Sequence, residues 1–213
     1  HPLGQDILQI SVEGAIATLV MSRPEKRNAM CEELLHALES FFSAPPGGVK
    51  VAILTGTAGH YCSGLDLSEH VHREPEENFY HSRHWHSVME KIQFGGLAVV
   101  SAMFGAVIGG GMELAAATHV RIAEPSTIFQ LPEGRRGIFV GGGATARVGR
   151  IIGPDRMTEM MLTGRKYSAD EGLTLGLAHY SVGEGEAMSL AQTLAGKISR
   201  NAQFANMLML QAI

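Results

Sequence analysis

Two short motifs in the chain each place a carboxylate where acid/base chemistry can take place. The three glycines at 109–111 come directly before an apolar helical pattern that contains Glu113, and Glu133 follows in the segment LPEG at 131–134. Backbone amides at the start of a helix can hold a developing oxyanion. Two carboxylates in one pocket can manage a proton and a water molecule. Together the two motifs indicate acid/base chemistry on a carbonyl compound.

Each of these residues also has a simpler interpretation. Glycine clusters usually serve a turn or close helix packing, and an acidic residue in the first turn of a helix, here Glu113, stabilises the helix dipole. Glu133 is followed closely by Arg135 and Arg136, which would hold the carboxylate ionised. The apolar neighbours of Glu113 instead predict partial burial, which favours the neutral acid. The glycine spacing matches neither a dinucleotide fingerprint nor a P-loop.

Other reactive residue types carry weaker signals. The segment CSGLDL at 62–67 follows a predicted strand and supplies a second turn with available amides. Cys62 within it has no basic neighbour, so we expect an inert thiol. His81, His84 and His86 lie close together, but no cysteine or H-E-x-x-H pattern accompanies them. A polar helix face explains them better, and we predict no metal site.

Composition limits the class of protein. The 213 residues are 45% hydrophobic and 18% charged, which is typical of one globular domain. A net charge of −4 and a pI near 6.2 argue against nucleic acid as a partner. Two cysteines favour a reducing compartment, the cytoplasm. No apolar run reaches the roughly 20 residues that span a bilayer, so we expect no membrane partner.

Hydrophobic periodicity predicts strands that alternate with helices. Apolar runs predict strands over 7–12, 15–21, 51–54, 97–102, 119–123 and 180–182, with a short extended segment at 127–130. Helical spacing predicts helices over 31–42, 78–92, 110–118, 144–152, 155–162, 169–175 and 186–200. Residues 202–213 form an apolar helical pattern without a polar or glycine cap, which we expect to pack on another subunit. The alternation indicates an α/β architecture, and this architecture must position the two glutamates.

In identity and order, these motifs resemble those of the crotonase superfamily, the enoyl-CoA hydratase/isomerase family. The similar segments are SRPEKRNA at 22–29, CSGLDL at 62–67, GGGMEL at 109–114, LPE at 131–133 and LTGR at 162–165. The resemblance covers nearly the whole chain and implies an α/β crotonase (ClpP-like) fold, a repeated β-β-α superhelix followed by C-terminal helices. It implies a crotonase core domain over 1–195 and the start of a helical trimerisation region over 196–213, which we expect to be incomplete. The assembly implied is a homotrimer or a dimer of trimers.

The resemblance also assigns roles to residues of this chain. It implies an oxyanion hole formed by the backbone N–H groups of Leu65 and Gly110, and two catalytic glutamates, Glu113 and Glu133, around one water molecule. The residues implied for coenzyme A binding are Arg23, Lys26, Arg27, Ala29, Ser63, Leu65, Asp66 and Leu67. The acyl pocket is expected to draw on the helix predicted over 78–92, with His84, Trp85 and Met89 as its candidates.

The activity implied is that of an enoyl-CoA hydratase, which adds water across the 2-enoyl double bond of an acyl-CoA thioester through an oxyanion-stabilised enolate. Such an enzyme would act in fatty acid β-oxidation or related acyl-CoA catabolism. Two alternatives stay open: an enoyl-CoA isomerase that shifts the double bond, and a non-catalytic CoA-binding paralogue. The fold alone does not separate them. No cofactor is implied, because coenzyme A enters as part of the substrate.

Overall fold

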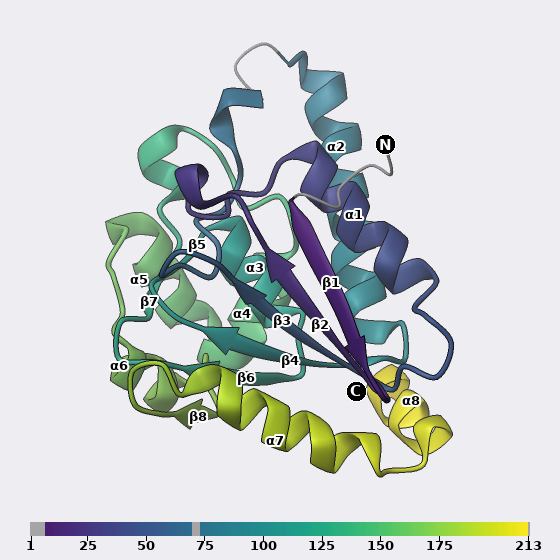
Figure 1. Ribbon diagram of the computed structural model, residues 1–213. Helices are drawn as coiled ribbons and strands as arrows, with labels where there is room; N and C mark the ends of the chain where they lie inside the picture. The colour runs from purple at the N-terminus through teal and green to yellow at the C-terminus, as the bar shows by residue number, and fades with distance from the viewer. Residues whose placement is uncertain (1–6, 70–72, 213) are drawn as a thin grey trace.

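The structure, a computed structural model, describes residues 7–69 and 73–212 and has the predicted α/β architecture (Figure 1). Its main sheet has six strands in the order β1-β2-β3-β4-β6-β8. These strands are β1 (Leu8–Glu13), β2 (Ile16–Met21), β3 (Val51–Gly56), β4 (Ala98–Met103), β6 (Val120–Ala123) and β8 (Tyr180–Ser181). Strands β1 and β2 form an antiparallel pair, and every other neighbouring pair in this sheet is parallel.

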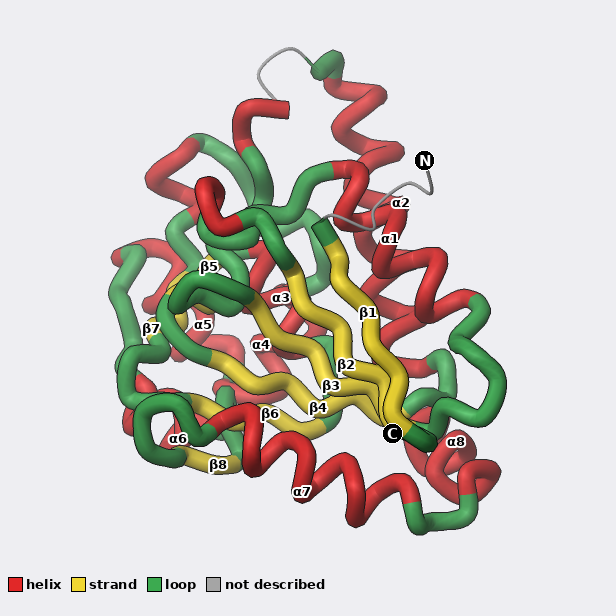
Figure 2. Tube along the Cα trace, in the orientation of Figure 1, coloured by secondary structure: helices red, strands yellow, loops and turns green. Residues whose placement is uncertain are grey.

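Helices connect the strands and cover both faces of the main sheet (Figure 2). They are α1 (Glu32–Ser43), α2 (Pro75–Phe94), α3 (Gly110–Ala116), α4 (Ala144–Ile152), α5 (Pro154–Thr163), α6 (Ala169–Leu175), α7 (Ala187–Ser199) and α8 (Gln203–Ala212). Short 3₁₀ turns lie at Pro24–Lys26, Leu67–Glu69 and Glu133–Arg136. Within the described ranges, no helix combines the length and the apolar character needed to cross a bilayer. Residues 1–6 and 70–72 of the predicted core domain and Ile213 of the predicted terminal region lie outside the described residues.

The middle strands of the sheet are buried on both faces. Val51 and Ile53 of β3 pack with three alanines of α7, which lies along one face of the sheet (Figure 1). Ala52 and Leu54 belong to the larger core on the other face, which includes residues of α1, α2 and α3. Double burial explains why this strand is an unbroken apolar run rather than an alternating one.

A second, two-stranded parallel sheet pairs β5 (Ala106–Ile108) with β7 (Ile128–Gln130). Cys62 joins its edge through a parallel bridge to Val107. The sequence pattern predicts the extended segment at β7 but no strand at β5, although each of these strands has three residues. This small sheet brings the segment that follows Cys62 next to the glycines that open α3.

Candidate active site

Two backbone segments meet at the small sheet, and glycine allows their close approach. The N–H of Cys62 donates to the carbonyl of Ala106 (2.9 Å), and the N–H of Ile108 donates to the carbonyl of Cys62 (3.1 Å). A Cβ atom on Gly64 would lie 2.7 Å from the Ile108 oxygen, and one on Gly111 would lie 2.2 Å from the Cys62 oxygen. Any larger residue at either position would push the two segments apart.

This approach leaves two backbone amides available side by side. In the described part of the chain, the N–H groups of Leu65 and Gly110 donate to no acceptor. The Leu65 nitrogen lies 3.4 Å from the point where a Cβ on Gly110 would sit. The adjacent amides are occupied, since Gly109 donates to the Gln130 carbonyl (2.8 Å) and Asp66 to the Met30 carbonyl (2.9 Å). Two fixed, unoccupied donors of this kind can bind an oxyanion.

Two cavities adjoin at these amides. One, of about 480 Å³, extends toward α2, and the other, of about 590 Å³, extends toward the 3₁₀ turn at Pro24–Lys26. Both are lined by Leu65, Gly110, Glu133 and Ile138. A ligand that occupies both cavities must therefore pass the two available amides.

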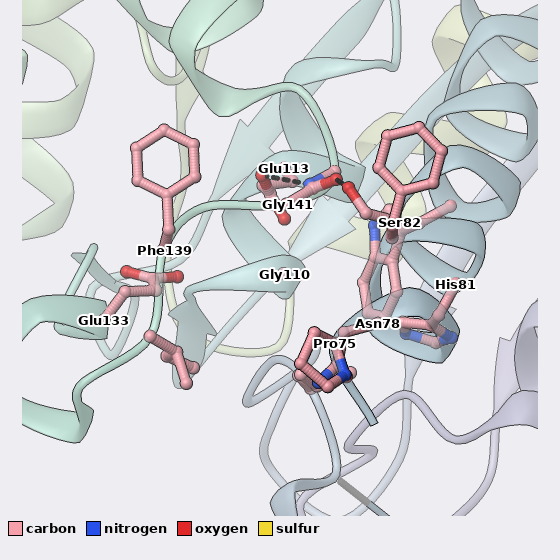
Figure 3. Close-up of a pocket in the computed structure, with 14 residues that line it drawn as sticks. Pro75, Asn78, His81, Ser82, Gly110, Glu113, Glu133, Phe139 and Gly141 are labelled. Atoms are coloured by element: carbon pink, nitrogen blue, oxygen red, sulfur yellow. Dashed lines mark hydrogen bonds between the residues drawn. The ribbon is translucent and has the colours of Figure 1, made fainter. Parts of the chain in front are cut away.

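The first cavity has an apolar wall with two carboxylates. Its apolar lining residues are Leu65, Pro75, Phe79, Trp85, Ile138 and Phe139. Figure 3 shows Glu113 and Glu133 across the cavity from Asn78, His81 and Ser82 of α2. Ser82 donates to the Gly141 carbonyl (2.7 Å) and so ties α2 to the glycine-rich loop before α4. The cavity thus combines an apolar acyl-sized space with groups that can handle a proton.

Glu113 lies one turn into α3 and is only 4% exposed. Burial raises the pKa of its carboxyl group, and two backbone hydrogen bonds partly offset that effect. Both bonds reach Oε1, from the N–H groups of Gly142 (2.8 Å) and Ala144 (3.0 Å). No group in the described residues donates to Oε2. The fixed carboxylate thus keeps one oxygen available.

Glu133 is 8% exposed, and its Oε2 atom is buried without a hydrogen-bond partner in the described part of the chain. Burial, reinforced by the charge of Glu113, raises the pKa of Glu133 to about 7. The predicted pairing with two arginines is wrong. Arg135 donates to the Thr163 carbonyl, and neither Arg135 nor Arg136 forms an ion pair with Glu133 among the described residues. Without such a cation, Glu133 can carry a proton near neutral pH.

We expect the substitution Glu133→Gln to stabilise the fold at alkaline pH. An ordinary glutamate has a pKa of 4.5, and the folded value of Glu133 is about 7. Ionisation between these values favours the unfolded state, so stability is lost as the pH rises through this window. The loss above pH 7 is at most about 3 kcal/mol. Urea denaturation should show the advantage of the variant growing between pH 4 and pH 8; a constant difference would contradict the assignment.

The second cavity contains most of the residues predicted to bind coenzyme A. Lys26, Arg27, Ala29, Ser63, Leu65, Asp66 and Leu67 line it. Arg23 does not; it donates to the Ala29 carbonyl (2.6 Å) and to Asp66 Oδ2 (2.9 Å). Burial alone would raise the pKa of Asp66, but hydrogen bonds from Ser68 and Arg23 outweigh it and lower the pKa to about 2. Arg23 therefore holds the cavity wall rather than facing the space inside.

Three further cations line this second cavity. They are Arg135, Arg136 and Lys166. The sequence does not predict these three residues at this cavity. Lys166 belongs to no recognisable motif, and the position of the two arginines close to Glu133 suggests an ion pair with that carboxylate instead. Together with Lys26 and Arg27, they give the cavity an excess of positive charge suited to phosphate groups.

Of the three residues predicted for the acyl pocket, only Trp85 lines the first cavity. His84 is bonded to Glu39 of α1, and Met89 is fully buried in the core. The prediction did not include Phe79, which lies on the same helix as Trp85, or Phe139, which lies in a loop without a periodic pattern. Cys62 is buried, and burial raises the pKa of its thiol to about 12, as expected for an inert cysteine.

Ion pairs fix α2, the helix that carries Trp85, against α1. Glu39 of α1 binds Lys91 (2.6 Å) and His84 (2.8 Å) of α2. Hydrogen bonds from Lys91 and His84 lower the pKa of Glu39 to about 2. The ion pairs of Glu39 therefore join α1 to α2, the helix that forms one side of the first cavity.

The substitution Glu39→Gln should weaken the fold at neutral pH by up to about 1 kcal/mol, because these ion pairs are partly solvated. A lowered folded pKa contributes stability above the ordinary value of 4.5, and that contribution is lost as the pH falls toward 2. Thermal unfolding at pH 7 and pH 3 measures both effects. Glu33→Gln, an exposed change on the same helix, is the control. A deficit that stays constant with pH would contradict the ion-pair explanation.

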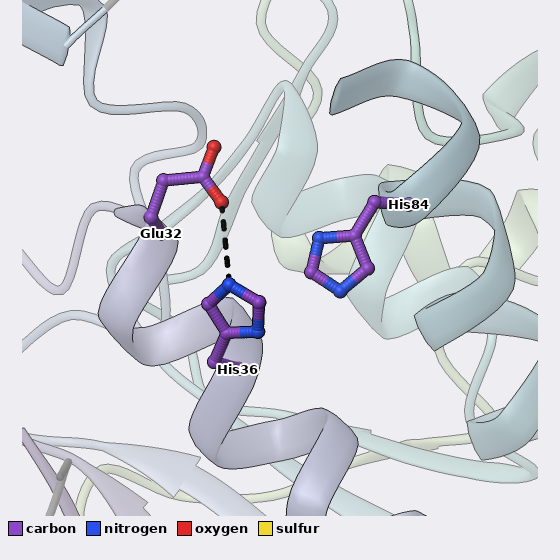
Figure 4. Close-up of side chains that lie close together, drawn as sticks. All are labelled: Glu32, His36 and His84. Atoms are coloured by element: carbon purple, nitrogen blue, oxygen red, sulfur yellow. Dashed lines mark ion pairs between the residues drawn. The ribbon is translucent and has the colours of Figure 1, made fainter. Parts of the chain in front are cut away.

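A second part of the same interface gathers Glu32 and His36 of α1 with His84 of α2 (Figure 4). Their potential ligand atoms lie within 4.8 Å of one another. Glu32 also contacts Arg73 (2.5 Å) and His81 (2.6 Å). Since these groups already pair with one another or with neighbouring charges, we assign the cluster to holding α2 in place.

Comparisons with known proteins agree with this geometry. The sequence matches the enoyl-CoA hydratase/isomerase family over residues 11–212. The short-chain-enoyl-CoA hydratase of Clostridium acetobutylicum is 30% identical, with 94% of this chain and 78% of that protein covered. Carnitinyl-CoA dehydratase of Proteus mirabilis is 29% identical, with 93% and 76% covered.

Solved structures show the same fold. A provisionally named enoyl-CoA hydratase from Rhodopseudomonas palustris has a TM-score of 0.94 and 43% identity, covering 97% of this chain and 80% of that one. The enoyl-CoA hydratase from Bacillus anthracis has a TM-score of 0.90 and 28% identity, covering 97% and 81%. The chain belongs to the enoyl-CoA hydratase/isomerase family, and the predicted crotonase fold is confirmed. Membership supports an enzyme that acts on an acyl-CoA thioester.

Proposed function

We propose that this protein is an enoyl-CoA hydratase that adds water across the 2-enoyl double bond of an acyl-CoA thioester. One observation carries the proposal: two buried glutamates face one cavity directly beside two available backbone amides. An isomerase needs only one group to move a proton between carbon atoms. Hydration needs one group that deprotonates water and a second that supplies a proton to carbon, and Glu113 with Glu133 provide both.

The amides of Leu65 and Gly110 receive the thioester oxygen. As the water oxygen bonds to C3, the electrons of the double bond move toward the carbonyl, and the negative charge gathers on that oxygen. The two N–H groups stabilise this enolate, because they are fixed beside one another and bonded to no other acceptor before the charge develops. Protonation at C2 then restores the thioester carbonyl and completes the addition of one water molecule.

The environments of the two glutamates favour different protonation states. Glu113 accepts two N–H groups at Oε1, which stabilise its anion, while Glu133 Oε2 has no donor in the described residues. The pair therefore holds its shared proton on Glu133. In this assignment Glu113 takes the proton from water, and Glu133 delivers its proton to C2.

Coenzyme A would occupy the second cavity, so that the thioester lies where the two cavities adjoin. Its phosphates would meet the cationic lining formed by Lys26, Arg27, Arg135, Arg136 and Lys166. The acyl chain would then extend into the first cavity beside Trp85 and Phe79. Substitution of Glu113 or Glu133 by glutamine should therefore remove proton transfer but leave thioester binding largely intact.

We also propose assembly into a homotrimer or a dimer of trimers. The support is an exposed apolar surface on α8, where Phe204 is 68%, Leu208 49% and Met209 53% exposed. Multi-angle light scattering should give a mass of three or six chains. A mass of one chain, 22.8 kDa, would contradict the proposal.

Crotonyl-CoA tests the catalytic proposal directly. Hydration removes the conjugated double bond, so the enone absorbance should fall on addition of the protein. A 3-enoyl-CoA supplied in parallel detects isomerisation, because its conversion to the conjugated 2-enoyl form raises the same absorbance. Absence of any fall across short, medium and aromatic 2-enoyl thioesters would reject the hydratase assignment.

A further inference from the structure

The indole N–H of Trp85 is a buried donor with no acceptor in the described part of the chain. The side chain is 4% exposed, projects from α2 and lines the first cavity. An unpaired buried donor is destabilising, and buried polar groups are nearly always hydrogen-bonded. This N–H group is therefore placed for something that enters the cavity rather than for the fold.

The unpaired donor lies next to the available oxygen of Glu113. Trp85 Nε1 is 2.3 Å, and Glu113 Oε2 is 2.6 Å, from the point where a Cβ on Gly142 would sit. The two atoms are thus within about 5 Å of each other, yet no hydrogen bond joins them, and one water molecule can bridge such a span. A side chain at position 142 would clash with both groups, so glycine is required for the indole and the carboxylate to lie this close to the loop.

The ring itself is held in place from several sides. Its Cζ2 atom lies 2.6 Å from the point where a Cβ on Gly110 would sit, so the indole spans the space between Gly110 and Gly142. His81 packs against it edge-on, with ring centroids 5.6 Å apart. A donor fixed beside the carboxylate, on a ring whose other edge lies against Gly110, can select one position for a small polar molecule.

We propose that the Trp85 indole N–H donates a hydrogen bond to the reacting water and so holds that water against Glu113 Oε2. This inference rests on the hydratase function proposed above. One lone pair of the water oxygen accepts from the indole, one O–H group points to Glu113, and the remaining lone pair bonds to C3. In the reverse reaction, the same N–H group stabilises the leaving hydroxyl oxygen.

Trp85 is the only tryptophan of the chain, which allows an almost atom-specific test. Expression in a tryptophan auxotroph supplied with benzothienylalanine replaces the indole N–H with sulfur at this position alone and keeps the bicyclic shape. Loss of one hydrogen bond of ordinary strength should lower kcat about tenfold, with KM changed less than about twofold.

The substitution Trp85→Phe should also lower kcat, and circular dichroism checks that this variant folds. Tyr80→Leu, an exposed aromatic change on α2 outside the cavity lining, is the matched control.

A binding measurement tests the same contact without turnover. Protein labelled with ¹⁵N-tryptophan gives one indole N–H resonance, which should move further downfield with 3-hydroxybutyryl-CoA than with butyryl-CoA, because only the former carries an oxygen at C3. Equal shifts with both ligands, or unchanged kcat in the sulfur analogue of an active enzyme, would overturn the inference alone. Wild-type protein that hydrates no 2-enoyl thioester would overturn the proposed function and this inference with it.

Discussion

Replacement of Glu113 by glutamine is expected to lower kcat for hydration by about 10²- to 10⁴-fold, and Glu133→Gln by a similar factor, because each removes one of the two proton transfers. Glutamine keeps nearly the same shape but cannot take a proton from water or deliver one to C2. Thioester binding, measured by quenching of Trp85 fluorescence, should change little.

The activity of the wild-type enzyme should fall as the pH rises through about 7, where Glu133 loses its proton.

The chain offers a matched control for these two substitutions. Glu124 is also buried, at 7% exposure, but its Oε1 accepts the N–H of Ala187 outside both cavities. Glu124→Gln should therefore retain kcat even if it costs some stability. An active Glu133→Gln variant beside an inactive Glu113→Gln variant would favour an isomerase with one working carboxylate. Two active variants would remove both glutamates from the chemistry.

Replacement of Gly110 by proline is expected to lower kcat by about 10²-fold or more relative to alanine at the same position, because proline lacks the N–H group that stabilises the enolate. Proline is tolerated at the first residue of a helix, and Gly110 is the first residue of α3. Both substitutions introduce a Cβ that meets Trp85 Cζ2 at 2.6 Å, so the comparison cancels that clash.

Circular dichroism and thermal unfolding should first show that both Gly110 variants fold. The ratio of their kcat values then isolates the N–H group from the added carbon. Equal kcat values for Gly110→Pro and Gly110→Ala would show that the amide of residue 110 does not hold the developing charge. A reduced activity in Gly110→Ala relative to wild type reports the effect of the added Cβ, which displaces the indole and lies 3.4 Å from the Leu65 nitrogen.

Much of the fold was predictable because its signals are local. The continuous apolar runs of β3 and β4 and the helical spacing of α1 each follow from burial on defined faces. The apolar neighbours of Glu113 likewise predict its burial, which the 4% exposure confirms. Strand β5 was not predicted, because its existence depends on pairing with Cys62 and β7, which are distant from it in the sequence, and this pairing builds the site.

The features of the site that the sequence does not reveal depend on where individual side chains point, which the spacing of residues along the chain does not determine. Arg135 follows Glu133 closely along the chain, yet it turns toward the Thr163 carbonyl and leaves the carboxylate without a cation. His84 and Trp85 are adjacent on α2, but one faces Glu39 of α1 and the other faces the cavity. Contacts between segments distant in sequence decide each of these orientations.

The most direct test of the central claim follows the oxygen atom. Wild-type protein is incubated with crotonyl-CoA in water enriched in heavy oxygen, and the product thioester is fragmented in a mass spectrometer. Hydration predicts a product heavier by one labelled water, with the label on C3, and none of this product when Glu113 and Glu133 are both glutamine. A product of unchanged mass with a shifted double bond, or no labelled product from folded protein with crotonyl-CoA or with the medium and aromatic 2-enoyl thioesters, would contradict the account.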